Sequence, residues 1–447
     1  MGAAGRSMPG AVRPGMDQKM DNMKNLKPSV YNETINEGDK TYLYNFYSGA
    51  IVEMEGGAQL EAAGVSMQDA ALLKEKGFLV DKNIDELKRL EFSYLSGKFN
   101  KSSLGLTLCT TLECNFSCPY CYEGKSRTGS AMSPEVITKI LEFVRMKLKD
   151  NNINTLYVNF LGGEALLRLD VLSAVLAGLK AEAARKNVVL VAGLVTNGYL
   201  LDEAMKVIDM PGDIQSVQVT FDGFGVSHDK MRRLAGGIGS FERIFANMVL
   251  ALEKGVRVAA RYNLTGDNAT DATLLIDKLA GLEKKPLLYF GHVSAVGSAD
   301  TCKSVSCMSR MDYSKADLKL ARYAASKGVK TDFMPVGKGN YCTADAVNGF
   351  TIDPEGDIYK CWSSVGRKEL ACGSVLVAAP EECITDESRY YMYTMDNPFQ
   401  DTCASCKLLP ICMGGCPVER QAGGRQCSKF KFQDMEFIKL YTEGVLR

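Results

Sequence analysis

The chain has 447 residues, which is too long for one ordinary hydrophobic core, so we expect two or three domains. Lys and Arg together number 53, as do Asp and Glu, which argues against a nucleic acid or an acidic membrane surface as the main partner. Apolar runs such as Val188–Val195 have the length of a strand and are far too short to cross a bilayer. These properties predict a cytoplasmic protein.

The N-terminal part of the chain predicts a tail followed by a small domain. Residues 1–28 hold Gly, Pro, Met and scattered charges without an apolar stretch, so they predict a disordered tail and no secretion signal. Residues 29–100 alternate strand-like pieces, Thr41–Tyr47 and Ala50–Met54, with a helical stretch that ends near Leu95. We expect a small α+β domain here.

Residues 101–330 repeat a strand followed by an amphipathic helix. The predicted strands are 105–110, 156–161, 188–196, 217–221, 256–264 and 287–292, and the predicted helices are 133–148, 169–185, 241–254 and 271–283. Six such units in series predict a parallel sheet, which is either doubly wound or curled into a partial (β/α)6 TIM-like barrel. In both cases the reaction takes place at the carboxyl ends of the strands.

Cysteine is the residue type that departs from ordinary composition. The chain holds 15 cysteines in clusters, and residues 331–447 are rich in Cys, Gly and short turns. Disulfides need an oxidising compartment, and no segment directs export, so clustered thiols indicate metal or redox chemistry. His228 and His292 are the only two histidines, which weakens zinc-hydrolase and His-dependent nucleophile hypotheses.

The first cysteine cluster follows the first predicted strand of this repeat. Cys114, Cys118 and Cys121 have the spacing C-x3-C-x2-C. An iron–sulfur cluster is usually held by four thiolates, so three thiolates leave one iron open to a reactive ligand. The simpler alternative is three buried structural thiols.

Residues 114–122 (CNFSCPYCY) resemble the signature loop of the radical S-adenosylmethionine (SAM) superfamily, and four further motifs follow at successive strand ends in the order of that family. They are Gly162-Gly163-Glu164; Thr196-Asn197-Gly198; Thr220-Phe221-Asp222-Gly223 followed by His228-Asp229 and Arg232; and Arg261-Tyr262-Asn263. Taken alone, each motif has a simpler interpretation as a turn or a surface charge.

The resemblance implies the ligand that each motif binds. Gly162 and Gly163 would let backbone approach SAM, and Glu164 would accept from its ammonium group. Arg232 would pair with the SAM carboxylate, and Tyr120 would pack on the adenine. Further SAM contacts are expected from Thr196, Asn197, Asp222 and Asn263. The implied reaction is reductive cleavage of SAM to a 5′-deoxyadenosyl radical that abstracts hydrogen, with electrons from a flavodoxin or ferredoxin.

The cysteines of the C-terminal region resemble a SPASM domain, the twin-cluster appendage of radical SAM enzymes that act on peptides and proteins. The resemblance assigns Cys342, Cys361 and Cys416 to auxiliary cluster I and Cys403, Cys406, Cys412 and Cys427 to auxiliary cluster II, which makes three [4Fe-4S] clusters in all. Zinc knuckles are the alternative, weakened by the lack of His.

Auxiliary cluster I has one cysteine too few. Either Cys372 or one of Cys302 and Cys307 completes it, or one iron stays open, and we favour the open iron. Cys109 and Cys383 are expected to be ordinary buried residues.

The N-terminal segments Lys27–Asn32 and Tyr44–Ala50 are similar to the opening of several ribosomal-peptide maturases. Strand edges there would either pair with a leader peptide or merely cap the barrel. The leading hypothesis is hydrogen abstraction from a ribosomally made precursor peptide, which gives a crosslink, an epimerised residue or a rearranged backbone. A small recognition protein is a further candidate partner. The alternatives are a sulfatase-type maturase, which forms formylglycine, and a non-catalytic iron–sulfur scaffold, which cleaves no SAM.

Overall fold

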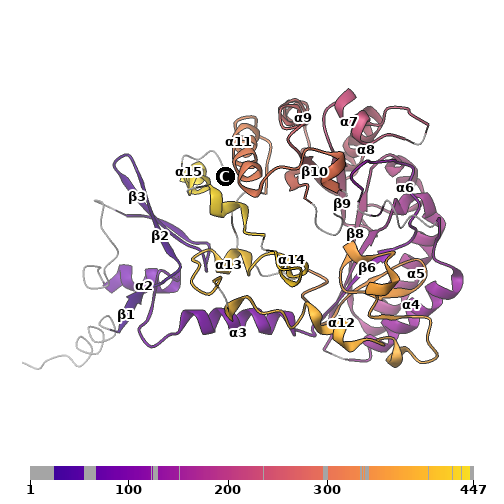
Figure 1. The fold of residues 1–447 in the computed structure, drawn as a ribbon, viewed down its shortest axis with the longest axis horizontal. Coiled ribbons are helices and arrows are strands. Elements are labelled where there is room, and N and C mark those ends of the chain that lie inside the picture. The colour runs from indigo at the N-terminus through magenta and orange to yellow at the C-terminus, as the bar shows by residue number, and fades with distance from the viewer. Residues whose placement is uncertain are drawn as a thin grey trace, which may run out of the picture. The chain divides into compact units, whose positions relative to one another are not determined.

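The computed structural model describes residues 25–54, 67–121, 123, 129–150, 152–234, 236–294, 301–332, 335, 337, 342–400, 402–424, 426–433 and 435–442. The chain divides into two compact units, whose elements Figure 1 labels. The smaller unit contains the described residues up to Phe92, with Pro335, Gly337 and Ala404–Ile411. The larger unit contains the rest. The predicted boundaries after residues 100 and 330 stay predictions.

The smaller unit is built on a three-stranded antiparallel sheet in the order β2-β3-β4. Its elements are β1 (Leu26–Pro28), β2 (Asn32–Glu37), β3 (Lys40–Asn45), β4 (Ile51–Met54), α2 (Met67–Glu75), β5 (Leu79–Asp81) and the start of α3 (Glu86–Lys98). The two predicted strands and the helix near Leu95 are thus confirmed. The predicted tail is wrong for Leu26–Pro28, since these residues form β1 and pair with β5. Residues 1–24 of that tail lie outside the described part of the chain.

The larger unit contains all six strands predicted for residues 101–330. They are β6 (Ser103–Cys109), β7 (Thr155–Leu161), β8 (Val189–Thr196), β9 (Ser216–Phe221), β10 (Arg257–Leu264) and β11 (Leu287–His292). Each strand pairs in parallel with its sequence neighbour. A doubly wound sheet reverses its strand order, whereas the order of these six strands does not reverse, so the partial barrel is the correct alternative.

Helices such as α4 (Pro134–Lys147), α5 (Leu169–Lys186) and α8 (Phe241–Glu253) lie along the outer side of these strands (Figure 1). The other helices of this region are α6 (Leu201–Val207), α7 (Val226–Met231), α9 (Asp271–Ala280), α10 (Thr301–Ser304) and α11 (Arg310–Ser326). Helix α4 shows why the sequence predicts its helices well. The Ser133 side chain accepts a hydrogen bond from the backbone N–H of Val136, and Val136, Ile140 and Phe143 lie buried on one helix face.

The Cys-rich region adds strands to the same sheet. Its strands are β12 (Gly349–Ile352), β13 (Asp357–Tyr359) and β14 (Gly373–Ser374), and its helices are α12 (Glu387–Met392), α13 (Leu409–Cys412), α14 (Pro417–Gln421) and α15 (Glu436–Thr442). Strand β12 pairs in parallel with β6, so the sheet order is β11-β10-β9-β8-β7-β6-β12-β13-β14. The sequence does not predict this pairing, because a four-residue strand leaves little periodic signal.

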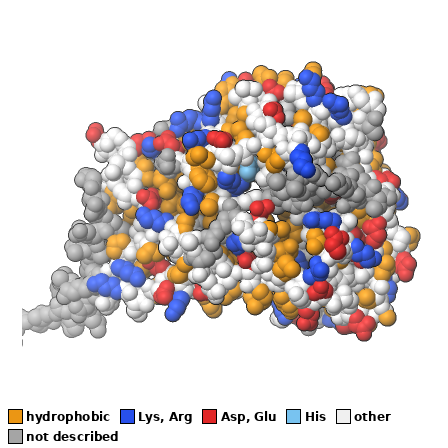
Figure 2. All heavy atoms as spheres, in the orientation of Figure 1, with side chains coloured by type: hydrophobic (Ala, Val, Ile, Leu, Met, Phe, Trp, Pro, Cys, Tyr) orange, Lys and Arg blue, Asp and Glu red, His pale blue; other side chains and the backbone are white. Residues whose placement is uncertain are grey.

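The surface agrees with the balanced composition. Acidic and basic side chains are interspersed on the face that Figure 2 shows. None of the helices in the described ranges has both the length and the apolar character needed to cross a membrane.

Candidate functional site

The carboxyl ends of the parallel strands surround a cavity of about 600 Å³. Predicted site residues from every motif line this cavity. They are Cys114, Cys118, Tyr120, Cys121, Gly162, Gly163, Thr196, Asn197, Arg232 and Asn263. Segments up to about 150 residues apart therefore meet at one place, as expected for a parallel sheet whose strands all end at one edge.

The cysteine loop is held from two sides. The backbone N–H of Ser117 donates to the carbonyl of Arg233 at 2.9 Å, and Phe116 forms a β-bridge with Leu234. Phe116 is buried, and its ring lies under the guanidinium of Arg232 at 5.5 Å. The loop that carries the thiols is thereby tied to the segment after β9.

Gly162 and Gly163 allow a close contact between their turn and the backbone of Thr111 and Glu113. A Cβ on Gly162 would collide with the carbonyl oxygen of Thr111, and one on Gly163 would collide with that of Glu113. The backbone N–H of Gly163 donates to Thr111 at 3.0 Å, which fixes the spacing between this turn and the cysteine loop. The glycines thus let two backbone segments approach each other beside the cavity.

Glu164 is buried and does not line the cavity. One carboxylate oxygen accepts from the hydroxyl of Thr196, and the other accepts from the backbone N–H of Asn197, both at 2.7 Å. Glu164 therefore joins the ends of β7 and β8. Its contact with the SAM ammonium group stays a prediction.

Four predicted cofactor residues form one hydrogen-bonded network around the Tyr120 hydroxyl. This hydroxyl donates to Asp222 at 2.5 Å and accepts from Arg232 at 3.2 Å and from Asn263 at 3.0 Å. Arg232 also pairs with Asp222 at 3.0 Å. Burial raises the pKa of Tyr120, and the Asp222 carboxylate raises it further, so the hydroxyl keeps its proton. These residues come from three different motifs.

The donors around the cavity fit SAM and an iron–sulfur cluster. The Nε atom of Arg232 is buried without a hydrogen-bond partner in the structure as described, which leaves a charged donor for an amino-acid carboxylate. No three Cys, His, Asp or Glu side chains among the described residues lie close enough to hold a single metal ion. Thiolates of a [4Fe-4S] cluster bind different irons, so such a cluster tolerates the wider spacing of Cys114, Cys118 and Cys121.

The sequence interpretation missed three polar residues that line the same cavity, Asn159 on β7, Gln218 on β9 and Tyr289 on β11. Arg261 on β10, which belongs to the predicted Arg261-Tyr262-Asn263 motif, lines the cavity too. Arg261 donates through Nε to Asn263 at 2.7 Å, and its guanidinium lies 5.8 Å from the Tyr289 ring centre. A polar residue inside an otherwise apolar predicted strand, such as Gln218 in 217–221, is the signal that would have found these three, because alternate strand residues share one face.

Neither histidine is placed to act as a base. His228 is fully buried, burial lowers its pKa to about 4, and its Nδ1 accepts from the backbone N–H of Asp222 at 3.3 Å. His292 lines the cavity, but its Nε2 lies 2.9 Å from the carbonyl of Met308 and its Nδ1 lies 3.1 Å from Arg310. Both ring nitrogens of His292 are therefore engaged.

A second cavity, of about 300 Å³, brings together the three cysteines predicted for auxiliary cluster I. Cys342, Cys361 and Cys416 line it together with the buried Lys360. Trp362 and Ser363 line both this cavity and the first one.

The cysteines proposed to complete that set do not line the second cavity. Cys372 is buried and its thiol donates to the carbonyl of Ile358, while Cys302 and Cys307 form a disulfide with each other. Cys109 and Cys383 are buried, as expected. The ligand set of auxiliary cluster II stays a prediction, since Cys406 belongs to the smaller unit and the other three cysteines to the larger one.

Comparison with known proteins identifies the domain that carries the first cavity. The family model described as the Radical SAM superfamily matches residues 108–278. The PqqA peptide cyclase of Granulibacter bethesdensis is 22% identical over 325 residues, which covers 70% of this chain and 82% of that protein. The Fe-coproporphyrin III synthase of Methanosarcina barkeri is 24% identical over 352 residues, with the same two shares.

Solved structures share the fold. Native anSMEcpe with bound AdoMet and the Cp18Cys peptide has a TM-score of 0.56 and 19% identity, and covers 77% of this chain and 97% of its own. Streptococcus suis SuiB bound to its precursor peptide SuiA has a TM-score of 0.54 and 14% identity, and covers 90% of this chain and 98% of its own. These likenesses confirm the α/β partial barrel.

Proposed function

Residues 108–278 of this chain match the Radical SAM superfamily, and from that premise we propose that the protein removes a hydrogen atom from a ribosomally made peptide. The radical SAM fold binds SAM and a [4Fe-4S] cluster, which together supply the 5′-deoxyadenosyl radical for that step. The expected product is a crosslink, an epimerised residue or a rearranged backbone. The protein's own part is to orient the two reactants and to exclude water from the cavity.

We assign the SAM contacts by chemical fit. Arg232 offers its Nε–H to the SAM carboxylate. We assign the SAM amino group to the part of the cavity wall that Gly162 and Gly163 form. The Tyr120 ring is an aromatic face for the adenine, and its hydroxyl bond to Asp222 holds the ring in one orientation.

A peptide substrate is supported by what the similar proteins are called. One relative is a peptide cyclase, and two solved relatives hold a peptide. Another relative is named an Fe-coproporphyrin III synthase, so the substrate has to be tested directly. Strands β2 and β4 are the two edges of the N-terminal sheet, and either edge would accept an extended leader peptide by strand addition.

The observation that carries the proposal is the wall that the two cysteine-lined cavities share. Trp362 and Ser363 line both, so a substrate bound in the first cavity lies next to the thiols of the second. We propose that Cys342, Cys361 and Cys416 hold an auxiliary cluster with one open iron, and that Cys403, Cys406, Cys412 and Cys427 hold another.

The test is SAM cleavage by the anaerobic, iron-reconstituted protein reduced with dithionite, followed as 5′-deoxyadenosine. We expect Cys118→Ala to abolish it and Cys403→Ala to spare part of it while stopping peptide turnover. Cys383→Ala is the matched control, because Cys383 is buried and lines neither cavity. Cleavage that survives in Cys118→Ala would refute the assignment of the first cluster.

The substrate is tested with the short peptides encoded next to the gene for this chain. Each is incubated with SAM and the reduced protein in deuterated water, so that epimerisation also changes the mass, and its mass and fragmentation are compared before and after. Loss of hydrogen or a changed α-carbon configuration supports the proposal. Formylglycine at a Cys or Ser favours the sulfatase-type alternative, and SAM consumption without a changed peptide contradicts a peptide substrate.

A further inference from the structure

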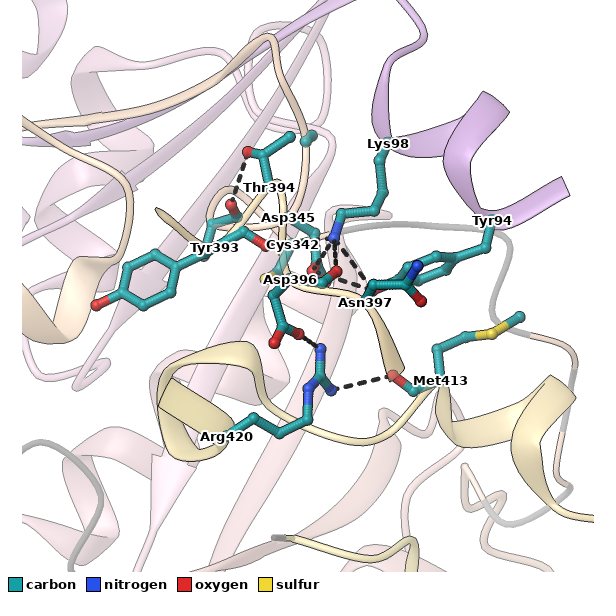
Figure 3. Close-up of polar contacts among 12 residues, drawn as sticks. Tyr94, Lys98, Cys342, Asp345, Tyr393, Thr394, Asp396, Asn397, Met413 and Arg420 are labelled. Atoms are coloured by element: carbon teal, nitrogen blue, oxygen red, sulfur yellow. Dashed lines mark hydrogen bonds and ion pairs between the residues drawn. The ribbon is translucent and has the colours of Figure 1, made fainter. Parts of the chain in front are cut away.

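The loop that carries Cys342 rests on a fully buried ion pair, which Figure 3 shows. Lys98, the last residue of α3, and Asp345, three residues after Cys342, both have fully buried side chains. Their charged atoms lie 3.6 Å apart. The other carboxylate oxygen of Asp345 lies 3.7 Å from the sulfur of Cys342.

Two buried lysines fix this loop through its backbone and its neighbours. Lys98 donates to the carbonyls of Tyr393 at 3.2 Å and Asp396 at 2.8 Å. Lys360, next to Cys361, donates to the carbonyls of Ala346 at 2.6 Å and Gly349 at 2.8 Å. The segment between Cys342 and β12 is thus held by two lysine side chains.

Burying these charges is costly by itself. A buried ion pair rarely stabilises a fold more than apolar side chains of the same size would. The carboxylate of this pair is that of Asp345, because the nearby Asp396 pairs with Arg420 instead. An iron–sulfur cluster on three thiolates carries negative charge, so its electron affinity depends on the charges of Lys98 and Asp345 nearby.

We propose that Lys98 and Asp345 are positioning residues that set the reduction potential of the auxiliary cluster held by Cys342, Cys361 and Cys416. The inference rests on the proposed function, since it requires that cluster. Asp345 puts a negative charge beside a ligand sulfur and so disfavours the added electron, whereas Lys98 favours it. The two residues therefore act on the potential in opposite directions.

The experiment measures the midpoint potential of the auxiliary clusters by dye-mediated titration followed by electron paramagnetic resonance. It uses the full chain with Cys114, Cys118 and Cys121 changed to Ala, so that only auxiliary clusters load. We expect Asp345→Asn to raise the ratio of reduced to oxidised cluster about tenfold at a fixed potential, a shift of about 59 mV for one electron. Lys98→Met is expected to lower the midpoint potential of one of the two auxiliary clusters, read from its electron paramagnetic resonance signal.

The double variant Lys98→Met/Asp345→Asn removes both charges of the pair, so it covers the case in which a single variant fails to fold because one charge is left unpaired. Its potential is expected to lie between those of the two single variants. Glu182→Gln is the control, because Glu182 is also a buried, arginine-paired carboxylate, at 2.8 Å from Arg145, but contacts no cysteine. It should lower stability and leave both potentials unchanged.

The inference is overturned if the iron-loaded single variants shift the potential in the same direction, or if neither shifts it. It is also overturned if the midpoint potential of the iron-loaded double variant lies far outside the range between the two single variants, by more than the width of that range. Failure of the background protein to bind any iron would instead refute the auxiliary clusters of the proposed function.

Discussion

The phenolic oxygen of Tyr120 lies 2.5 Å from Oδ2 of Asp222, a residue 102 positions further along the chain. Tyr120 comes from the cysteine loop and Asp222 from the end of β9. The same hydroxyl accepts hydrogen bonds from Arg232 and Asn263, so a single atom ties the cysteine loop to β9 and β10. This network prearranges the SAM side of the cavity before any ligand is bound.

Arg232→Met should weaken SAM binding about 10- to 100-fold, because a charge-assisted hydrogen bond contributes about 1.5–3 kcal/mol. Equilibrium binding of SAM to the reconstituted protein measures the effect. Arg233→Met is the neighbouring control, since the Arg233 side chain is exposed and donates only to the carbonyl of Lys230. Unchanged SAM affinity in Arg232→Met would rule out this contact.

Gly163→Ala should lower the free energy of unfolding by about 1–3 kcal/mol, because the added methyl group overpacks the turn against the backbone of Glu113. Denaturant unfolding measures the change, and iron content reports on the cysteine loop. Gly236→Ala is the matched control, since a Cβ at Gly236 meets nothing within 4 Å. Equal stability of the two variants would contradict the close approach.

His228 should make the protein acid-sensitive. Its pKa is about 4 in the folded chain and about 6.5 in the unfolded chain, so the unfolded chain binds the proton first. The stabilisation is complete above pH 6.5 and is lost as the pH falls toward 4, by about 2 kcal/mol between pH 7 and 5. His228→Phe should lose less stability over that interval. The same pH dependence in both proteins would show that His228 does not cause it.

Trp362 should report on both cavities. It is the only tryptophan of the chain, it is 43% exposed, and it lines both cysteine-lined cavities. Loading the clusters should remove most of its fluorescence, because iron–sulfur clusters quench nearby indoles. Variants that lack the ligands of either cavity should each recover part of the emission. Emission that is indifferent to iron loading would mean that Trp362 lies near neither cluster.

Local sequence predicts the six strands of the barrel, because each pairs with its sequence neighbour and carries buried apolar residues, at alternate positions in β7 and at the end of β8. It also predicts the thiol-bearing loop, since three cysteines within eight residues cannot lie far apart. By contrast, the sequence gives no sign that β12 pairs with β6 or that Leu26–Pro28 forms a strand. Such short strands form only because they pair with a strand that is distant in the sequence.

The sequence by itself determined the chemistry of this protein: which side chains are thiols, which are charged, and in what order they leave the strands. Only the tertiary structure decided that Arg232 is already paired with Asp222, that Glu164 lies off the cavity, and that Asp345 lies between Lys98 and Cys342. The physical reason is that residue types are read locally. Pairing and burial instead depend on chain segments that fold together from far apart, and these contacts set what each charge does.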